Sequence, residues 1–339
     1  MTPELSLSVV VVAPYGFAPM RRLLDYLAEQ TIRERIEIVI VATTRQALQP
    51  DEAALDRFGA YRVLETGAMT DLSRPRMSGI LAARAPIVVL TEDHCFPAPD
   101  WAEALVRAHE GPWAAVGPTV ALANPQRFRA WTNYLLQYGP WIQPTSGGEM
   151  TDLPGHNSSY KREVLAEYGE GLADFLVADT MLHWDLRRRG HRLYLETSAR
   201  VHHVYMTGLR PFVAENYYIG RQFAASRARR WSVLLRLAFT LGSPLIPLVR
   251  LTRTLRRMRE FGWLGSLLPG ILPSLGIALA VSAAGELMGY AFGVGDAAAK
   301  TLDLDFRRDR YVSAEERNAL WGTGLVRFPS EPPSPRHLS

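Results

Sequence analysis

The sequence predicts a doubly wound α/β sheet followed by apolar helices that associate with a membrane. Short β-branched runs alternate with helical patterns over roughly the first hundred residues. These runs are mostly apolar, as expected for strands buried on both faces of a parallel sheet. After Trp231 the composition changes to long apolar stretches interrupted by arginines, which is typical of membrane-associated helices.

Eight elements alternate in the first part of the predicted sheet. Strands are predicted at residues 5–13, 35–41, 61–64 and 86–90, and helices at 20–30, 53–58, 76–83 and 99–109. Ligands of such a sheet bind outside the carboxyl ends of its strands. The segment Pro14-Tyr15-Gly16 and the run Glu92-Asp93-His94 both lie at such ends.

The pattern continues less regularly toward Trp231. A strand is predicted at 112–122, a helix at 126–138, and a turn-rich loop bordering the site at 144–154. Ser158 or Ser159 is expected to cap a helix that contains Val164. The remaining elements are a helix at 179–189, which Gly190 ends, and a strand at 192–195.

Two apolar stretches define a separate region after the predicted sheet, residues 231–295. We predict an interfacial helix at 233–249, a spanning or re-entrant segment within 263–294, and a basic linker between them that faces anionic headgroups. Spanning by the first stretch alone would place that linker on the wrong side of the membrane. A pair of buried helices in a soluble domain is the alternative. Residues 296–339 form a polar tail, and its last ten residues are predicted to be disordered.

Charge and cysteine content indicate the class of partner and the cellular compartment. The net charge is only +4, but residues 187–259 contain sixteen arginines against two acidic residues, so this block predicts an anionic partner. A nucleic-acid partner is disfavoured because the block borders apolar stretches and does not alternate with exposed aromatic residues. The single cysteine, Cys95, and the lack of a signal-peptide pattern favour the cytoplasmic face of the cell membrane.

The run VVLTEDHCFPAPDW, residues 88–101, ends a buried strand with three side chains that can bind metal. On an extended segment Glu92 and His94 point to the same side and Asp93 points away. A carboxylate with an imidazole suits Mn²⁺ better than Mg²⁺. A solvated loop, in which Asp93 and Asp100 act only as caps, is the alternative.

These motifs together resemble family 2 inverting glycosyltransferases of GT-A fold, over about residues 6–230. The family's Asp triplet, followed by an apolar residue, Pro, Asp and Trp, is similar to TEDHCFPAPDW. Further similarity lies in the Arg-containing helix SRPRMSGILAARA, in GHNSSYKREVL at the acceptor side, in VADTMLHWDLRRRGHRL, and weakly in RQFAASRARRW. The resemblance implies a GT-A-type mixed sheet in a catalytic domain of residues 1–230, with a nucleotide-sugar half at 5–110 and an acceptor half at 111–230.

The resemblance also implies an activity and a set of residues. A sugar would pass from a nucleotide-diphosphate sugar to a lipid-linked or cell-envelope acceptor, with Asp179 as general base and Asp174 in reserve. The residues expected to bind the donor are Pro14, Tyr15, Thr43, Arg76, Glu92 and Asp93. On the acceptor side we expect Asn157, Arg230 and Trp231. The divalent cation would be held by Glu92, His94 and His202, with His203 as the other candidate histidine.

Three departures from the family pattern keep a second function open. His94 replaces the last aspartate of the triplet, Ala178 replaces the glutamate before the base, and the end of the second strand offers Thr43 and Thr44 where an aspartate is usual. A catalytically silent relative that binds nucleotide or membrane as a scaffold is therefore the alternative. In RQFAASRARRW, Arg227 stands where the family has Gln, which argues against processive polymerisation.

Overall fold

The computed structural model describes residues 4–329, which divide into two compact units. The first unit comprises residues up to Val120 and Thr145–His203, and the second comprises Ala121–Pro144 and the chain from Val204 onward. The predicted domain boundary at residue 230 falls inside the second unit. The disorder predicted for the last ten residues lies outside the described part of the chain.

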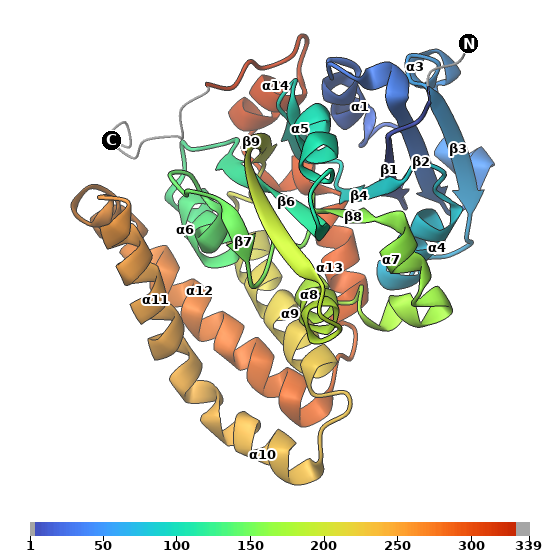
Figure 1. The fold of residues 1–339 in the computed structure, drawn as a ribbon. Helices are drawn as coiled ribbons and strands as arrows, with labels where there is room; N and C mark the ends of the chain where they lie inside the picture. The colour runs from blue at the N-terminus through green and yellow to red at the C-terminus, as the bar shows by residue number, and fades with distance from the viewer. Residues whose placement is uncertain (1–3, 330–339) are drawn as a thin grey trace. The chain divides into compact units, whose positions relative to one another are not determined.

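The first unit contains a mixed sheet with strand order β3-β2-β1-β4-β8-β6-β9-β5, and β7 pairs with β9 (Figure 1). Its elements are β1 (Leu7–Ala13), α1 (Arg21–Ala28), η1 (Arg33–Arg35), β2 (Ile36–Ala42), α2 (Arg45–Leu48), α3 (Glu52–Leu55), β3 (Ala60–Glu65), α4 (Ser73–Ala82), β4 (Ile87–Thr91), β5 (Cys95–Pro97), α5 (Trp101–Ala108), β6 (Trp113–Leu122), β7 (Gly148–Met150), β8 (Ser159–Lys161), α7 (Arg162–Ala166), η3 (Gly169–Asp174), α8 (Asp179–Arg188) and β9 (Arg192–His203).

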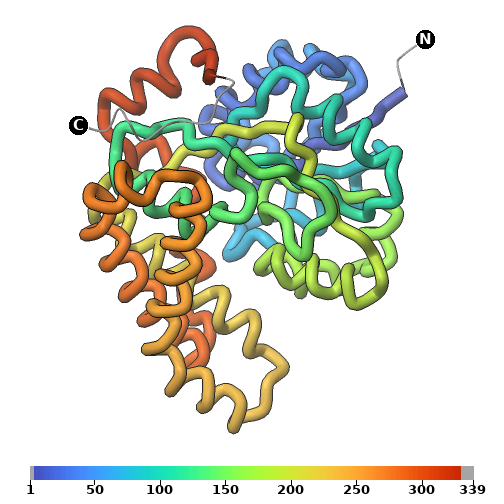
Figure 2. The backbone as a smooth tube through the Cα atoms, turned by 60° about the vertical axis from the view of Figure 1, so that its left-hand side comes forward, coloured from blue at the N-terminus to red at the C-terminus, as the bar shows by residue number. Residues whose placement is uncertain are grey.

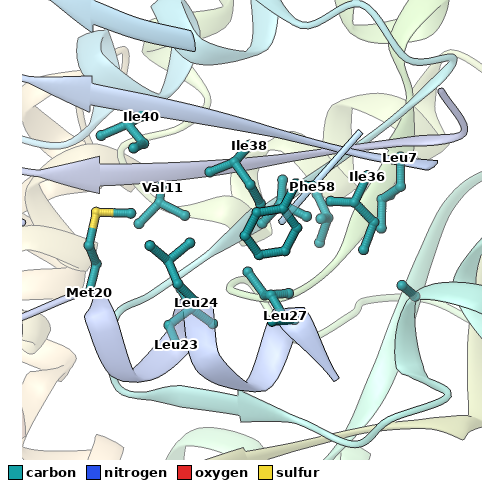
Figure 3. Packing of buried hydrophobic residues seen from close by; sticks show 14 of the residues in the cluster. Leu7, Val11, Met20, Leu23, Leu24, Leu27, Ile36, Ile38, Ile40 and Phe58 are labelled. Carbon is teal, nitrogen blue, oxygen red and sulfur yellow. The ribbon is translucent and has the colours of Figure 1, made fainter. Parts of the chain in front are cut away.

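The four predicted parallel strands pair as expected of a doubly wound sheet. β1 lies between β2 and β4, parallel to both, and β3 adds to the outer edge of β2. Val11 packs with Leu23 and Leu24 of α1 on one face (Figure 3). On the other face, Gly79 of α4 lies so close that a Cβ atom there would be 2.4 Å from Cγ1 of Val10. Burial on both faces explains why these runs are mostly apolar, with Ser8 of β1 and Glu37 of β2 as buried polar exceptions.

Three local predictions are corrected by the structure. Ser158 and Ser159 do not cap a helix, because Ser159 begins β8 and Lys161 is the N-cap residue of α7. The strand predicted to end at Leu195 continues to His203. The loop at 144–154 contains the short strand β7.

The second unit is helical. Its elements are α6 (Phe128–Tyr138), η2 (Gly139–Trp141), α9 (Leu209–Arg227), α10 (Val233–Gly242), η4 (Ser243–Leu245), α11 (Ile246–Glu260), α12 (Leu264–Phe292), α13 (Ala297–Asp305), η5 (Arg308–Tyr311) and α14 (Ala314–Trp321). The chain turns back after α11, so α12 runs beside α10 and α11 (Figure 2). α12 also packs along α9 and against α6.

Two helices of this unit are long and apolar enough to cross a membrane, by length and composition. They are Val233–Glu260, which combines α10, η4 and α11, and Leu264–Phe292. In the most apolar window of the first only 6% of the residues are buried, compared with 39% in the second. The first helix therefore has the larger apolar surface left to cover.

Replacing Gly285 by alanine is expected to destabilise the helical unit by about 1 to 3 kcal/mol, the usual cost of overpacking. A Cβ atom at Gly285 would lie 2.1 Å from the backbone oxygen of Tyr217, so α12 would have to move away from α9. Gly276→Ala on the same helix is the control, since a Cβ atom there meets no atom within 4 Å. Thermal unfolding of the full chain in detergent measures both, and equal midpoints for the two variants would contradict the predicted packing.

Candidate functional site

The candidate site begins where β4 ends, and its centre is the buried carboxylate of Glu92. The chain after Thr91 turns sharply, with the backbone N–H of Cys95 donating to the oxygen of Glu92 at 3.1 Å. Glu92 and His94 come together as predicted, but the segment is a turn and not an extended strand. The Glu92 side chain is only 3% exposed, so its charge needs compensation from nearby groups.

The two oxygens of Glu92 face different groups. Oε1 lies 3.2 Å from Nδ1 of His156 and 3.7 Å from Nη2 of Arg76. Oε2 lies 3.3 Å from Nε2 of His94, 3.7 Å from Nε2 of His203 and 3.8 Å from the sulfur of Cys95. Glu92 thus separates a half that contains an arginine from a half that contains histidines and a thiol.

The pKa of Glu92 follows from these neighbours. Burial raises the pKa of the carboxyl, but His156, His94 and His203 outweigh burial and hold it well below its usual range. Burial is also the main reason why the pKa of His156 is lowered. Arg76 donates from Nη2 to Nδ1 of His156 at 2.8 Å, which requires that this nitrogen carry no proton. Glu92 is therefore ionised and His156 neutral at pH 7.

Asp179 joins the arginine half of the site. It is the first residue of α8, where the helix dipole favours a negative charge. Its Oδ2 lies 4.0 Å from Nη1 of Arg76 and 3.8 Å from Nδ1 of His156. Its buried Oδ1 accepts no hydrogen bond from the described residues. Gly155 leaves room for this carboxylate, because a Cβ atom there would lie 2.5 Å from Oδ2.

A buried hydrogen-bond chain holds α8 in position. Nδ1 of His183 lies 2.5 Å from Oδ1 of Asp152, and Nε2 lies 2.9 Å from the hydroxyl of Tyr160. An ionised carboxylate can only accept, so Nδ1 donates to Asp152 and the Tyr160 hydroxyl donates to Nε2. Since His183 is one helical turn from Asp179, this chain positions the carboxylate of Asp179.

The metal-capable half of the site consists of Glu92, His94, Cys95 and His203, whose ligand atoms all lie within 4.8 Å of one another. The predicted ligand His202 points elsewhere, with its Nδ1 3.3 Å from the backbone oxygen of Phe96. β9 continues through both histidines, and successive side chains of a strand point to opposite faces. The structure therefore places His203 beside Glu92 and His94 in place of His202. Burial lowers the pKa of His202 to about 4.

The other predicted donor residues lie at the carboxyl ends of parallel strands. Ala13 of β1 pairs with Ala42 of β2, so Pro14 and Thr43 follow neighbouring strand ends. Tyr15 is 38% exposed. Asp93 lies on the histidine half, where its Oδ1 is 2.9 Å from Nδ1 of His94.

Of the predicted acceptor residues, only Asn157 lies in the first unit. Its side chain accepts a hydrogen bond from the hydroxyl of Thr91 at 2.6 Å and donates to the sulfur of Cys95 at 3.3 Å. Arg230 and Trp231 belong to the second unit. There the Trp231 ring stacks on Tyr290 at 5.7 Å and packs against Phe239.

Sequence reasoning missed three side chains of the site: Cys95, His156 and the orienting His183. His156 and Cys95 are adjacent to residues that were singled out, Asn157 and His94, and this adjacency was the available signal. His183 carries no local signal, because its partners Asp152 and Tyr160 are remote in sequence.

The profile described as glycosyl transferase family 2 matches residues 8–169. No match was found among the curated proteins.

Three solved structures are similar to the chain at low sequence identity. The crystal structure of S. aureus TarS has 14% identity and a TM-score of 0.42, with 84% of this chain and 55% of that chain covered. The crystal structure of S. aureus TarS 1-349 has 15% identity and a TM-score of 0.44, with 84% and 90% covered. The mannosyltransferase PcManGT from Pyrobaculum calidifontis, in complex with GDP-Man and Mn²⁺, has 18% identity and a TM-score of 0.48, with 89% and 88% covered.

Replacing Glu92 by glutamine is expected to lower the free energy of unfolding at pH 7 and to lower it less in acid. A carboxyl whose folded pKa is depressed contributes stability above its unfolded pKa, about 4.3, and loses that contribution as the pH falls toward the folded pKa. Denaturant unfolding at a series of pH values measures the difference between wild type and variant. This difference should shrink as the pH falls below the unfolded pKa, and a constant difference would contradict the assignment.

Proposed function

Since residues 8–169 belong to glycosyl transferase family 2, we propose that this glycosyltransferase of GT-A fold moves a sugar from a nucleotide-diphosphate sugar to a lipid-linked or cell-envelope acceptor hydroxyl, with inversion. One observation carries the proposal. Glu92, at the end of β4, and Asp179, at the start of α8, share the same two neighbours, Arg76 and His156. Arg76, which can compensate the charge of a leaving diphosphate, therefore lies beside Asp179, which can accept a proton.

Asp179 acts as the general base in this proposal. Inverting transfer needs a carboxylate that takes the proton from the attacking hydroxyl. Asp179 has a buried oxygen, Oδ1, to which the described residues donate no hydrogen bond. Nη1 of Arg76 lies 4.0 Å from the other oxygen, Oδ2, so the carboxylate is near a cation without forming a close ion pair.

The donor occupies the carboxyl ends of β1, β2 and β4 in this proposal. Pro14, Tyr15 and Thr43 border the nucleoside, and Arg76 donates to the diphosphate. Asp93 orients His94 through its carboxylate. Asn157 supports the floor of the site through Thr91 and Cys95.

A divalent cation assists the transfer in this proposal, with Mn²⁺ favoured over Mg²⁺. The donor set fits such an ion, because the carboxylate of Glu92 and the imidazole of His94 face each other at 3.3 Å. When bound, the cation would neutralise the charge that develops on the leaving diphosphate.

Membrane association follows from the surface of α10 and α11. The arginines that interrupt the apolar stretch turn inward: Arg236 donates to the backbone oxygens of Tyr290 and Ala291, and Arg250 pairs with Glu286 at 2.6 Å. The residues left on the outside are apolar and strongly exposed: Val233, Leu234, Leu241, Leu245 and Leu248. We propose that this surface enters the apolar boundary of an anionic membrane at its cytoplasmic face, with Arg253 and Arg259 toward the headgroups.

Replacing Asp179 by asparagine is expected to lower the transfer rate by about 10² to 10⁴-fold, the usual contribution of a general base. The assay incubates a panel of nucleotide-diphosphate sugars with the full chain, metal and membrane extract, and measures nucleotide release. Binding of the donor should persist in the variant, because Arg76 and Glu92 remain.

Asp174→Asn is the matched control, because Asp174 is the reserve candidate for the base. If Asp179 is the base, this variant should keep the wild-type rate. If the asparagine variant at 179 turned over like wild type, Asp179 would not be the base. A wild-type protein that binds nucleotide and releases none from any donor would instead support the scaffold alternative.

Replacing Leu234 and Leu241 by glutamate is expected to reduce membrane binding at least tenfold, the equivalent of about 1.4 kcal/mol. Both side chains are about four-fifths exposed, at 79% and 80%, so neither change disturbs a packed interior. Flotation with vesicles that contain anionic lipid measures the effect. Leu81→Glu, at a 44% exposed leucine of α4, is the control, and equal flotation of all three proteins would exclude the proposed surface.

A further inference from the structure

We propose that Glu92, His94, Cys95 and His203 form a binding site for a thiophilic transition metal of the Zn²⁺ class, with the Cys95 thiolate as a ligand. This deepens the proposed cation site, to which it adds two ligands and a metal class. It does not depend on transfer activity, because the ligands can be tested without a donor.

The first argument is the arrangement around Oε2 of Glu92. The other three ligand atoms lie 3.3 Å (His94), 3.7 Å (His203) and 3.8 Å (Cys95) from this oxygen. A tetrahedral zinc ion with bonds of about 2.0 to 2.3 Å separates its ligand atoms by about 3.3 to 3.8 Å. All four atoms lie within 4.8 Å of one another, so small side-chain movements would close the set.

The second argument is the orientation of the His94 ring. Its Nδ1 lies 2.9 Å from the carboxylate of Asp93. This contact leaves Nε2 facing Oε2 of Glu92 at 3.3 Å. A carboxylate that holds the second nitrogen of a histidine is also the usual support of a metal-ligating imidazole.

The third argument is the support of the thiol. The amide of Asn157 donates to the sulfur of Cys95, and Thr91 fixes that amide by donating to its oxygen. Hydrogen bonds to a ligating sulfur are a common feature of metal sites. β5 and β9 pair Cys95 directly with His203, so the backbone fixes these two ligands relative to each other.

The donor set decides the class of metal. One carboxylate, two imidazoles and a thiolate suit Zn²⁺ and Co²⁺, whereas Mg²⁺ requires oxygen ligands. Binding replaces the thiol proton of Cys95, which passes to the solvent, and thiolate and carboxylate together balance the charge of the dication.

The test is Co²⁺ binding to the metal-free full chain in the absence of any donor. The expected spectrum has a near-ultraviolet thiolate-to-cobalt charge-transfer band and intense visible bands of a tetrahedral ion, and Zn²⁺ should displace both. Cys95→Ser should remove the charge-transfer band and weaken Zn²⁺ binding at least about tenfold, more than it weakens Mn²⁺ binding. Asp93→Asn, which removes the support of His94, should weaken binding by about 10 to 100-fold.

His202→Gln is the matched control, since it changes the neighbouring histidine on the opposite face of β9, and it should bind as wild type does. His203→Gln should bind more weakly but keep the charge-transfer band, which covers the case that the serine variant fails to fold. No uptake of Co²⁺ or Zn²⁺ by the folded wild type would overturn the site. A spectrum without the thiolate band would overturn the role of Cys95. A chain that binds zinc in this way but transfers no sugar would refute only the proposed function.

Discussion

The site depends on one electrostatic constraint, the burial of the Glu92 carboxylate. A buried carboxylate is costly unless charges and hydrogen-bond donors surround it, and Glu92 meets this requirement with a different set of groups at each oxygen. These groups come from α4, from the loop before β8, from the turn after β4 and from β9. The need to compensate one charge thus fixes four parts of the first unit around one point.

The same constraint connects the two chemical roles that we propose. Arg76 and His156 lie between Glu92 and Asp179. A change in charge near Glu92 therefore changes the electrostatic potential at Asp179, the proposed base. His183, held by Tyr160 and Asp152, and the small residue Gly155 keep α8 close enough for this coupling. In the helical unit, pairing of Arg236 and Arg250 with α12 follows a similar rule. Arg236 and Arg250 are satisfied inside the helix pair, and the exposed side chains of α10 include Val233, Leu234 and Leu241.

Local pattern was sufficient for most of the fold. The strands β1, β2, β3 and β4 and the helices α1, α3 and α4 were predicted within a few residues, because β-branched runs and helical periodicity are local properties. The four-residue helix α2 was not predicted. β8 was missed because a three-residue strand has no periodicity, and the end of β9 because charged and polar residues interrupt its apolar alternation. Because the strand was predicted to end at Leu195, the sequence did not show which way His202 and His203 point. In the continuous strand β9 these two side chains point to opposite faces.

The sequence by itself determined that an acidic run follows a buried strand, that an aspartate opens a later helix, and that residues 8–169 match glycosyl transferase family 2. These are features of consecutive residues, and they require no knowledge of what lies nearby in space. Only the tertiary structure decided which side chains share the buried carboxylate. His156, Cys95 and His203 reach Glu92 through strand pairing and loop packing between segments that are up to about a hundred residues apart, and such pairing depends on long-range register, which no local pattern encodes.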